Sequence, residues 1–324
     1  MSLCEVRVTT YKRPDLLKRS IETLINQTYP NWKAIVLDDS PAQEGKAVIE
    51  AFNDARIVYK PNPQNLGRTK NLDYAFQSSA MIGGTYAFVL EDDNYLYAEF
   101  IEKNIRSLNT HNVNLIMRNQ EIRLEENGTS IPTGKTSRGR WFRTGLYAPF
   151  EVHARLFFCE GISNGGMFWR TDKIQSNLQV GTQVDDAWHQ ELYRTLQLEE
   201  PLFFESEPLC VWTGFEEPQK EPDNLRESLF SLPARYNKVT QFILSKLIQK
   251  YGDSFVQIAA EVAATEKDEA IILERQLLNV RYLNYRFQHI RQIERVLLLL
   301  KNYFRSLQAQ RFVKRLPVPS TLHH

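Results

Sequence analysis

The stretch Tyr86-Ala87-Phe88-Val89-Leu90-Glu91-Asp92-Asp93-Asn94 joins a short, wholly apolar run to three adjacent carboxylates. The apolar part has the composition of a strand that is buried on both faces, as in a parallel sheet. Hard divalent cations are held by carboxylate oxygens and commonly share them with a substrate phosphate. The stretch therefore predicts either a metal–diphosphate site at the carboxyl edge of an α/β sheet, where such sheets place ligands, or an acidic turn that faces solvent.

Alternating strand and helix patterns surround this stretch. Strands are expected at residues 4–10, 32–37, 57–59 and 86–90, and helices at about 16–25, 41–52 and 68–79. This alternation is typical of a parallel, doubly wound sheet. The strand at 32–37 also ends in acids, Asp38 and Asp39, and the carboxyl ends of strands in one sheet face the same crevice. Two acidic strand ends favour a ligand site over a solvated turn.

The composition limits the class of protein. The 324 residues carry 40 basic and 39 acidic side chains, so the formal net charge of +1 gives no support to a dedicated nucleic-acid binder. The three cysteines lie far apart without metal-ligand spacing, and their odd number disfavours a disulfide framework. We expect a reduced, cytoplasmic setting, because no secretory signal is visible and no apolar run approaches the roughly 20 residues of a membrane span.

Several motifs together resemble those of the family 2 glycosyltransferases, which are inverting enzymes of the GT-A fold that use sugar nucleotides. The resemblance is carried by residues 8–14, 26–32, 36–40, 65–67, 70–71 and 90–94. It is dense up to about residue 100 and weakens toward Tyr193, and it is specific for the family but not for the substrate. It implies a mostly parallel sheet flanked by helices, with a Rossmann-like nucleotide-binding half.

The resemblance also implies which residues bind the donor. The expected nucleotide-sugar-binding residues are Thr9, Tyr11, Arg13, Asp38, Asp39, Lys70, Asn71 and Asp92. Of the acid pair, Asp39 is preferred for the nucleobase, because a carboxylate that accepts a base N–H orients the base. The alternative for Asp39 is an N-cap of the helix expected at 41–52, and the alternative for Lys70 is a solvated helix face.

The three acids at residues 91–93 match the family's Asp-x-Asp metal motif. We expect Asp93 to bind Mn or Mg directly and Glu91 to belong to the same metal site, with Glu91 and Asp92 also placed for the ribose or metal-bound water. A divalent ion there would bridge both phosphates and stabilise the departing diphosphate. Glu91 stands where the commonest pattern has Asp; it keeps the charge, and its own role is left open.

Two later motifs match the family's acceptor side. Asn164, Gly165 and Gly166 resemble its small-residue turn in the floor of the acceptor site, where glycine lets a sugar approach the backbone. Asp185 and Asp186 match its Glu-Asp pair, whose second acid is the general base, with Asp for the usual Glu at 185. Asp186 is the expected base, and helix capping is the alternative.

Trp188 follows directly after this acid pair. It is a candidate for stacking on the acceptor sugar, and packing in the core is its alternative.

The chain changes character after residue 215. We expect a catalytic domain at 1–215, a linker rich in proline and charge at 216–225, and an α-helical module at 226–324. Residues 296–300 are apolar and lie among arginines and lysines, which fits either an interfacial membrane helix or a packed or homo-oligomeric helix. If residues 296–300 form an interfacial helix, we expect the protein at the inner face of the membrane.

The predicted function is an inverting, metal-assisted glycosyltransferase with an Asp general base. It moves a sugar from a nucleoside diphosphate sugar, with a UDP-sugar expected, to a hydroxyl of a glycan or glycoconjugate, as in polysaccharide biosynthesis. One alternative is a sugar-nucleotide nucleotidyltransferase, which is disfavoured because residues 10–14 lack the glycine of a triphosphate cradle. The other is a non-catalytic sugar-nucleotide-binding or assembly protein, which the departures at Glu91 and Asp185 keep open.

Overall fold

The computed structural model describes residues 1–126, 129–139, 141–156, 161–181, 187–215, 242–243, 245–252 and 255. The chain divides into two compact units, one formed by Met1–Val152 with Glu160–Asn224 and the other by His153–Cys159 with Leu225–His324. The linker expected at 216–225 lies outside the described residues. So does the module expected at 226–324, apart from residues 242–243, 245–252 and 255.

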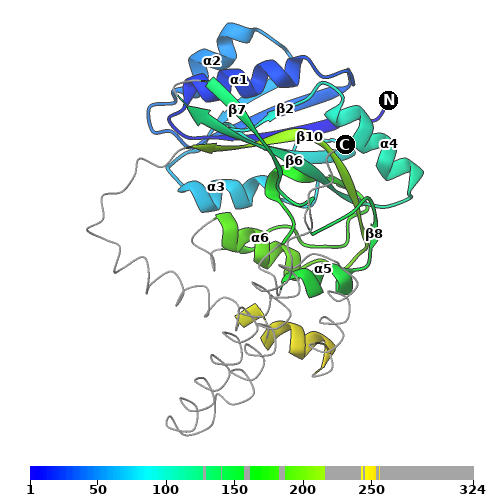
Figure 1. Cartoon of the computed structure of the whole chain (residues 1–324). Helices are drawn as coiled ribbons and strands as arrows, with labels where there is room; N and C mark the ends of the chain where they lie inside the picture. Colours follow the sequence, from blue (N-terminus) through cyan, green and yellow to red (C-terminus); the bar gives the residue numbers. More distant parts are fainter. Residues whose placement is uncertain are drawn as a thin grey trace, which may run out of the picture. The chain divides into compact units, whose positions relative to one another are not determined.

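The described strands of the first unit form one mixed sheet (Figure 1). They are β1 (Cys4–Thr10), β2 (Trp32–Asp38), β3 (Ile57–Pro61), β4 (Tyr86–Glu91), β5 (Tyr95–Leu96), β6 (Leu115–Glu126), β7 (Thr129–Thr136), β8 (Gly145–Tyr147), β9 (Met167–Arg170) and β10 (Leu202–Phe215). Their order is β3-β2-β1-β4-β9-β6-β10-β5, with β7 paired to β6 and β8 to β10. The first four strands are parallel, as the alternating pattern predicted, and β9 is antiparallel to its neighbours β4 and β6.

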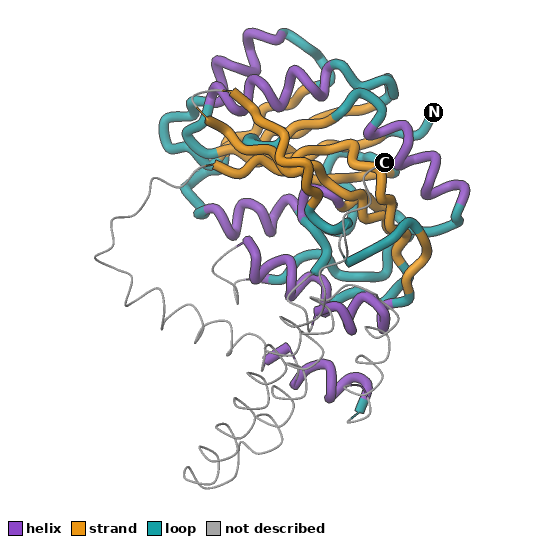
Figure 2. The backbone as a smooth tube through the Cα atoms, in the orientation of Figure 1, coloured by secondary structure: helices purple, strands orange, loops and turns teal. Residues whose placement is uncertain are grey.

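Helices cover both faces of this sheet, which confirms the predicted α/β class (Figures 1 and 2). They are α1 (Pro14–Ile25), α2 (Gly45–Phe52), α3 (Arg68–Ala75), α4 (Phe100–Thr110), α5 (Pro149–Arg155) and α6 (Ala187–Leu196). Both views show α1 and α2 on one face of the parallel strands and α3 on the other. The connections β1–α1, β2–α2 and β3–α3 therefore all leave the sheet at one edge, the carboxyl edge of the parallel strands.

Two helices are shorter than the sequence predicted, and side chains of the sheet explain why. Helix α2 begins at Gly45 rather than near residue 41, and the Asp38 carboxylate accepts the Gly45 N–H at 3.0 Å. Helix α3 ends at Ala75 rather than near residue 79, because Arg7 takes the carbonyl of Ala75 at 2.8 Å and that of Ser79 at 2.7 Å. A carbonyl held by a guanidinium no longer needs an intrahelical donor.

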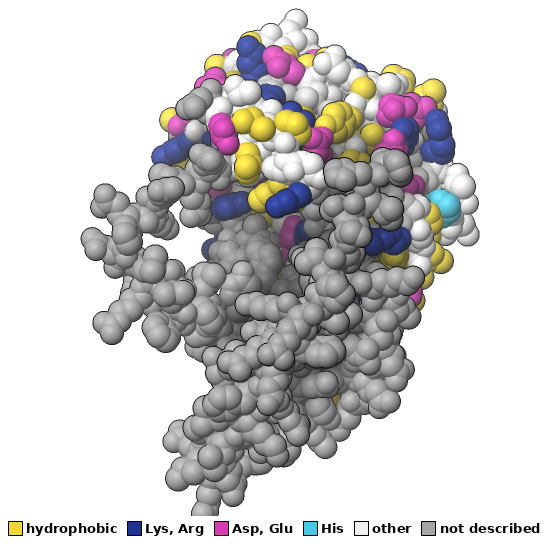
Figure 3. Space-filling view, in the orientation of Figure 1, with side chains coloured by type: hydrophobic (Ala, Val, Ile, Leu, Met, Phe, Trp, Pro, Cys, Tyr) yellow, Lys and Arg dark blue, Asp and Glu magenta, His cyan; other side chains and the backbone are white. Residues whose placement is uncertain are grey.

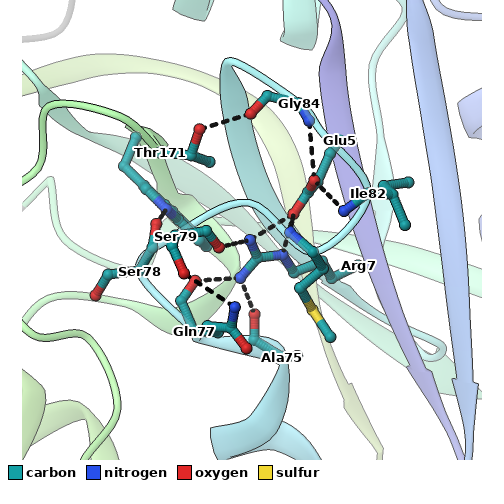
Figure 4. Close-up of polar contacts among 11 residues, drawn as sticks. Glu5, Arg7, Ala75, Gln77, Ser78, Ser79, Ile82, Gly84 and Thr171 are labelled. Atoms are coloured by element: carbon teal, nitrogen blue, oxygen red, sulfur yellow. Dashed lines mark hydrogen bonds and ion pairs between the residues drawn. The ribbon is translucent and has the colours of Figure 1, made fainter.

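Strand β1 buries an ion pair between Glu5 and Arg7, and both side chains are fully buried (Figure 4). Arg7 donates to the carbonyls of Ala75, Gln77 and Ser79, and Glu5 accepts the N–H groups of Met81, Ile82 and Gly84. Buried charges persist when they are paired and hydrogen-bonded, and this pair has six backbone partners. It therefore fixes the connection from α3 to β4, and β4 leads into the acids at residues 91–93.

Basic and acidic side chains are interspersed on the part of the first unit that Figure 3 shows. This mixture agrees with the formal net charge of +1. None of the helices in the described residues combines the length and the apolarity that a membrane-spanning segment needs.

Candidate functional site

A pocket lies where β1, β2 and β4 end and α3 begins. Its lining residues are Thr9, Thr10, Tyr11, Arg13, Asp39, Arg68, Asn71, Leu72, Glu91, Asp92 and Asp93. The space between these residues, with the open solvent at its mouth included, is about 510 Å³. The topology alone brings these segments together, because the carboxyl ends of parallel strands meet at one edge of the sheet.

Most of the predicted donor and metal residues meet in this pocket. Thr9, Tyr11, Arg13, Asp39, Asn71 and Asp92 line it, and so do Glu91 and Asp93. Asp38 and Lys70 do not. The pocket also contains Arg68, which is not among the residues expected from the motifs.

Asp38 and Asp39 are adjacent but face different surroundings. Asp38 is buried away from the pocket and accepts hydrogen bonds from the Ser40 N–H at 2.8 Å, the Gly45 N–H at 3.0 Å and the Tyr59 hydroxyl at 2.7 Å. Burial and the hydrogen bond to this carboxylate raise the pKa of Tyr59. Asp38 is therefore a structural acid that joins β2, β3 and the start of α2.

Asp39 holds the turn before α3. Its carboxylate accepts hydrogen bonds from Asn62 Nδ2 at 2.8 Å, the Leu66 N–H at 2.7 Å and the Gly67 N–H at 2.9 Å. It does not cap α2, whose N-cap residue is Glu44. A carboxylate offers about four acceptor positions, so one remains for a ligand in the pocket that Asp39 lines.

One face of α3 lines the pocket with Arg68, Asn71 and Leu72. Residues three and four apart share a face of a helix, whereas Lys70 lies on another face and is exposed. Asn71 is buried, donates to the Leu37 carbonyl at 3.1 Å and accepts from Asn62 at 2.9 Å. The helical spacing from Asn71 is the signal that would have selected Arg68 as a pocket residue.

The acids after β4 are held by β1 and by the start of α1. Asp92 Oδ2 accepts the Thr10 hydroxyl at 2.8 Å and the Tyr11 N–H at 3.4 Å. The Arg13 guanidinium lies 3.4 Å from Asp92 Oδ1 and 2.8 Å from Asp93 Oδ2. Two of the three neighbouring carboxylates, those of Asp92 and Asp93, thus meet a cation from the chain itself.

Burial and neighbouring charge make two of these acids weaker. Burial, and next the charge of Asp93, raises the pKa of Glu91 to about 8. The same two causes raise the pKa of Asp92 to about 6. Burial and mutual repulsion thus both disfavour the charged forms of these acids, and a cation bound at the turn would offset both effects.

Arg19 of α1 fixes the backbone of this acidic turn. Its guanidinium donates to the Asp93 carbonyl at 2.8 Å, pairs with Glu125 of β6 and lies 4.9 Å from the centre of the Tyr95 ring. Among the described residues, no group of three or more His, Cys, Asp or Glu side chains is arranged to hold a metal ion. A cation at this turn would therefore need ligands from elsewhere besides one or two carboxylates.

Comparison with known families identifies the domain. The family model described as Glycosyl transferase family 2 matches residues 5–165, which include the whole pocket lining. This chain belongs to glycosyl transferase family 2. The family predicted from the sequence motifs is thereby confirmed.

Curated relatives of this family 2 chain are distant. An uncharacterized glycosyltransferase of Methanocaldococcus jannaschii, MJ1057, is 27% identical over 196 residues, which cover 57% of this chain and 63% of that protein. The Escherichia coli UDP-Glc:alpha-D-GlcNAc-diphosphoundecaprenol beta-1,3-glucosyltransferase WfgD is 24% identical over 120 residues, which cover 37% of this chain and 46% of that protein. The chain spans less than two thirds of the length of each of these relatives.

Solved structures confirm the GT-A fold of this family 2 chain. Residues 1–349 of TarS from S. aureus, in complex with UDP-GlcNAc, superpose with a TM-score of 0.60 at 14% identity, covering 96% of this chain and 92% of that one. The mannosyltransferase PcManGT from Pyrobaculum calidifontis, in complex with GDP-Man and Mn²⁺, gives a TM-score of 0.50 at 12% identity, covering 96% and 83%.

On the acceptor side predicted for a family 2 enzyme, the turn Asn164–Gly166 packs tightly on β6. A Cβ on Gly166 would lie 2.2 Å from the Arg118 carbonyl oxygen, and a Cβ on Gly165 would lie 2.6 Å from Gln120 Nε2. The buried Asn164 donates its N–H to Glu191 at 2.8 Å and accepts from Arg194. Packing against the β6 backbone thus favours glycine at 166, whereas a Cβ at 165 would meet only the end of the Gln120 side chain.

Asp185, Asp186 and the side chain of Trp188 lie outside the described residues. The described range before them ends at Gly181, whose N–H donates to Asp73 at 3.0 Å. The chain after them resumes with α6, which begins at Ala187.

Proposed function

We propose that this chain is an inverting glycosyltransferase that moves a sugar from a nucleoside diphosphate sugar to a hydroxyl of a glycan or glycoconjugate. The observation that carries the proposal is the pocket, in which the acids that follow β2 and β4 lie together with Arg13 and Arg68. Asp39, which is separate from the acidic turn at residues 91–93, suits a nucleobase N–H, and the two arginines suit a diphosphate.

The pocket residues divide by chemistry along such a donor. Asp39 accepts a nucleobase N–H with its remaining acceptor position, and the half-exposed Tyr11 ring packs on the base. Thr9 and Asn71 also line the pocket and orient the nucleoside. Arg68 and Arg13 neutralise the diphosphate, because guanidinium groups pair with phosphate oxygens in a bidentate manner.

A divalent cation, Mn or Mg, fits the acidic turn. The donors are carboxylate oxygens, which these ions prefer, and Asp93 and Glu91 are the residues that would hold it. Mg-type sites commonly use one or two carboxylates together with substrate phosphates, which agrees with the absence of a three-residue cage among the described side chains. When bound, the cation neutralises the charge of the leaving diphosphate.

A UDP-sugar is the first donor to test. By its name WfgD uses UDP-Glc, and TarS is solved with UDP-GlcNAc. PcManGT is solved with GDP-Man and Mn²⁺, so a GDP-sugar is the second donor to test.

In the proposed transfer, Asp186 accepts the proton of the acceptor hydroxyl while the acceptor oxygen forms a bond to the anomeric carbon. The bond from that carbon to the diphosphate oxygen breaks on the opposite face, and its electron pair leaves with the diphosphate. A carboxylate base suits this step because the attacking hydroxyl must lose its proton as the new bond forms. Asp185 is the first acid of the same pair and supports the position of Asp186.

The test is donor turnover with UDP-Glc, UDP-GlcNAc and GDP-Man, each with Mn²⁺, with Mg²⁺ and with a chelator. We expect one donor to be hydrolysed slowly without acceptor, and the chelator to remove that activity. Asp186→Asn should keep UDP binding and lose about 10²- to 10⁴-fold in transfer. Asp172→Asn, at an exposed position, is the matched control. Failure of the chain to bind or hydrolyse any donor would overturn the proposal.

A further inference from the structure

Arg13 is the side chain that bridges Asp92 and Asp93. Its Nη1 lies 3.4 Å from Asp92 Oδ1 and 2.8 Å from Asp93 Oδ2. The Arg13 side chain is 45% exposed, whereas those of Asp92 and Asp93 are 7% and 15% exposed. The acids are therefore set in the pocket wall, and the guanidinium reaches them from the mouth.

The backbone of Arg13 is fixed, whereas its guanidinium is held by contacts with two carboxylates. The Arg13 carbonyl accepts the Leu17 N–H at 3.0 Å, and Pro14 follows as the first residue of α1. Within the part of the chain that the structure describes, the guanidinium has Asp92 and Asp93 as its polar partners. Because the guanidinium end of this pair is in contact with solvent, the pair is partly screened and a stronger partner can replace it.

Arg19 provides the contrast on the same helix. It also reaches Asp93, but through the backbone carbonyl at 2.8 Å, and it is held in addition by Glu125 and the Tyr95 ring. Its side chain is 27% exposed. Arg19 therefore positions the acidic turn, while Arg13 occupies the oxygens of its carboxylates.

We infer that Arg13 is an exchangeable counter-cation. Its guanidinium pairs with Asp92 and Asp93 until a divalent cation binds Asp93, and the guanidinium then pairs with the donor diphosphate. This inference rests on the proposed function. The cation and the guanidinium would compete for the Asp93 carboxylate, whose Oδ2 Arg13 contacts, and they repel each other. The diphosphate is the anion that enters with the cation, and it offers the guanidinium a bidentate partner.

The exchange has a thermodynamic consequence. Without nucleotide, the cation must displace the Arg13 guanidinium, which then finds no new partner. With nucleotide, the displaced guanidinium gains the diphosphate, so the cation and the nucleotide strengthen each other's binding. Such coupling is reciprocal, and it is measurable from either ligand.

The experiment measures the affinity for Mn²⁺ with and without UDP, and the affinity for UDP with and without Mn²⁺, by titration calorimetry and by the electron paramagnetic resonance signal of free Mn²⁺. GDP replaces UDP if the wild-type chain prefers it. The variants are Arg13→Gln, Arg13→Lys and Arg19→Gln. We expect Arg13→Gln to raise the affinity for Mn²⁺ alone about three- to tenfold, because it removes a competing charge. The same variant should lower the affinity for UDP in the presence of Mn²⁺ about five- to thirtyfold.

The other two variants separate exchange from loss of structure. Arg13→Lys keeps the charge and should restore most of the coupling between Mn²⁺ and UDP. Arg19→Gln should lower the affinity for Mn²⁺ in the absence of nucleotide, because Asp93 loses the donor that fixes its carbonyl. Opposite signs for two arginines that contact the same residue are not expected from general destabilisation.

Two outcomes overturn the inference. One is an affinity of Arg13→Gln for Mn²⁺ alone that equals or falls below that of the wild type. The other is a coupling between Mn²⁺ and UDP that the variant leaves unchanged, in which case the proposed function stands and only the role of Arg13 is lost. A wild-type chain that binds neither Mn²⁺ nor a nucleotide counts against the proposed function and the inference together.

Discussion

The carboxylate of Asp73 on α3 lies 3.6 Å from the fully buried guanidinium of Arg194 on α6. Asp73 also accepts the N–H groups of Val180 and Gly181 at 2.7 and 3.0 Å, and Arg194 donates to the Leu178 carbonyl at 2.6 Å. Burial lowers the pKa of Arg194 to about 10, so the guanidinium stays charged at neutral pH. The pair thus holds the segment before Asp185 and Asp186 between two helices.

Replacing Asp73 should destabilise the fold. Asp73→Asn leaves the buried charge of Arg194 without its carboxylate, and removing one partner of a buried pair costs about 3–5 kcal/mol. We expect a loss near the lower figure in the free energy of unfolding, measured by urea denaturation followed by circular dichroism, because Asn still accepts one N–H. Asp172→Asn, on the exposed surface, should change the same quantity by less than about 0.5 kcal/mol. Equal effects of the two variants would contradict the assignment.

The neighbours Asp38 and Asp39 should separate stability from binding. Asp39→Asn removes the charge that we assign to the nucleobase contact, and we expect the affinity for UDP to fall at least about tenfold, as for a charge-assisted hydrogen bond. Asp38→Asn weakens contacts with Tyr59 and Gly45 and should lower the melting temperature with little change in that affinity. Calorimetry and thermal unfolding of both variants test this division. A larger loss of UDP affinity in Asp38→Asn would reverse the assignment.

Arg68 and Lys70 give a test of which face of α3 meets the donor. Arg68 lines the pocket and Lys70 does not. Arg68→Gln should weaken UDP binding about five- to thirtyfold, because one phosphate-pairing guanidinium is lost. Lys70→Gln removes the same charge two residues away and should change the affinity less than about twofold, as expected for an exposed charge in salt. If both variants lose affinity equally, overall charge and not the pocket geometry decides binding.

The sequence predicted the elements that carry the site. Apolar runs that end in acids gave β2 and β4 almost to the residue, because buried parallel strands have a strong compositional signal, and the alternating run at 4–10 gave β1. Asp39 and the acids after β4 followed from their position at the carboxyl ends of those strands. These predictions depend on local pattern and on topology, both of which a single sequence contains.

The side chains that the sequence did not predict depend on rotation and on distant contacts. A shift of one residue rotates a helix side chain by about 100°, so choosing Arg68 over Lys70 requires knowing which face of α3 meets the sheet. The Glu5–Arg7 pair finds its partners at residues 75–84, and Arg194 finds Asp73 across more than a hundred residues. No local pattern encodes such pairings.

Gly166 tests whether the small-residue turn serves packing or a sugar. A Cβ at this position would lie 2.2 Å from the Arg118 carbonyl oxygen and 3.3 Å from its carbon, and β6 cannot move away because it pairs with β9 and β10. Gly166→Ala should therefore lower the free energy of unfolding by about 1–3 kcal/mol, the usual cost of overpacking.

Gly165→Ala is the matched control. Its new Cβ meets the side-chain amide of Gln120, which can turn, so we expect a smaller loss of stability. Urea denaturation of the two variants, with transfer activity measured beside it, separates the readings. If Gly166→Ala unfolds like the wild type and loses only transfer, the glycine serves the acceptor sugar and the packing argument is wrong.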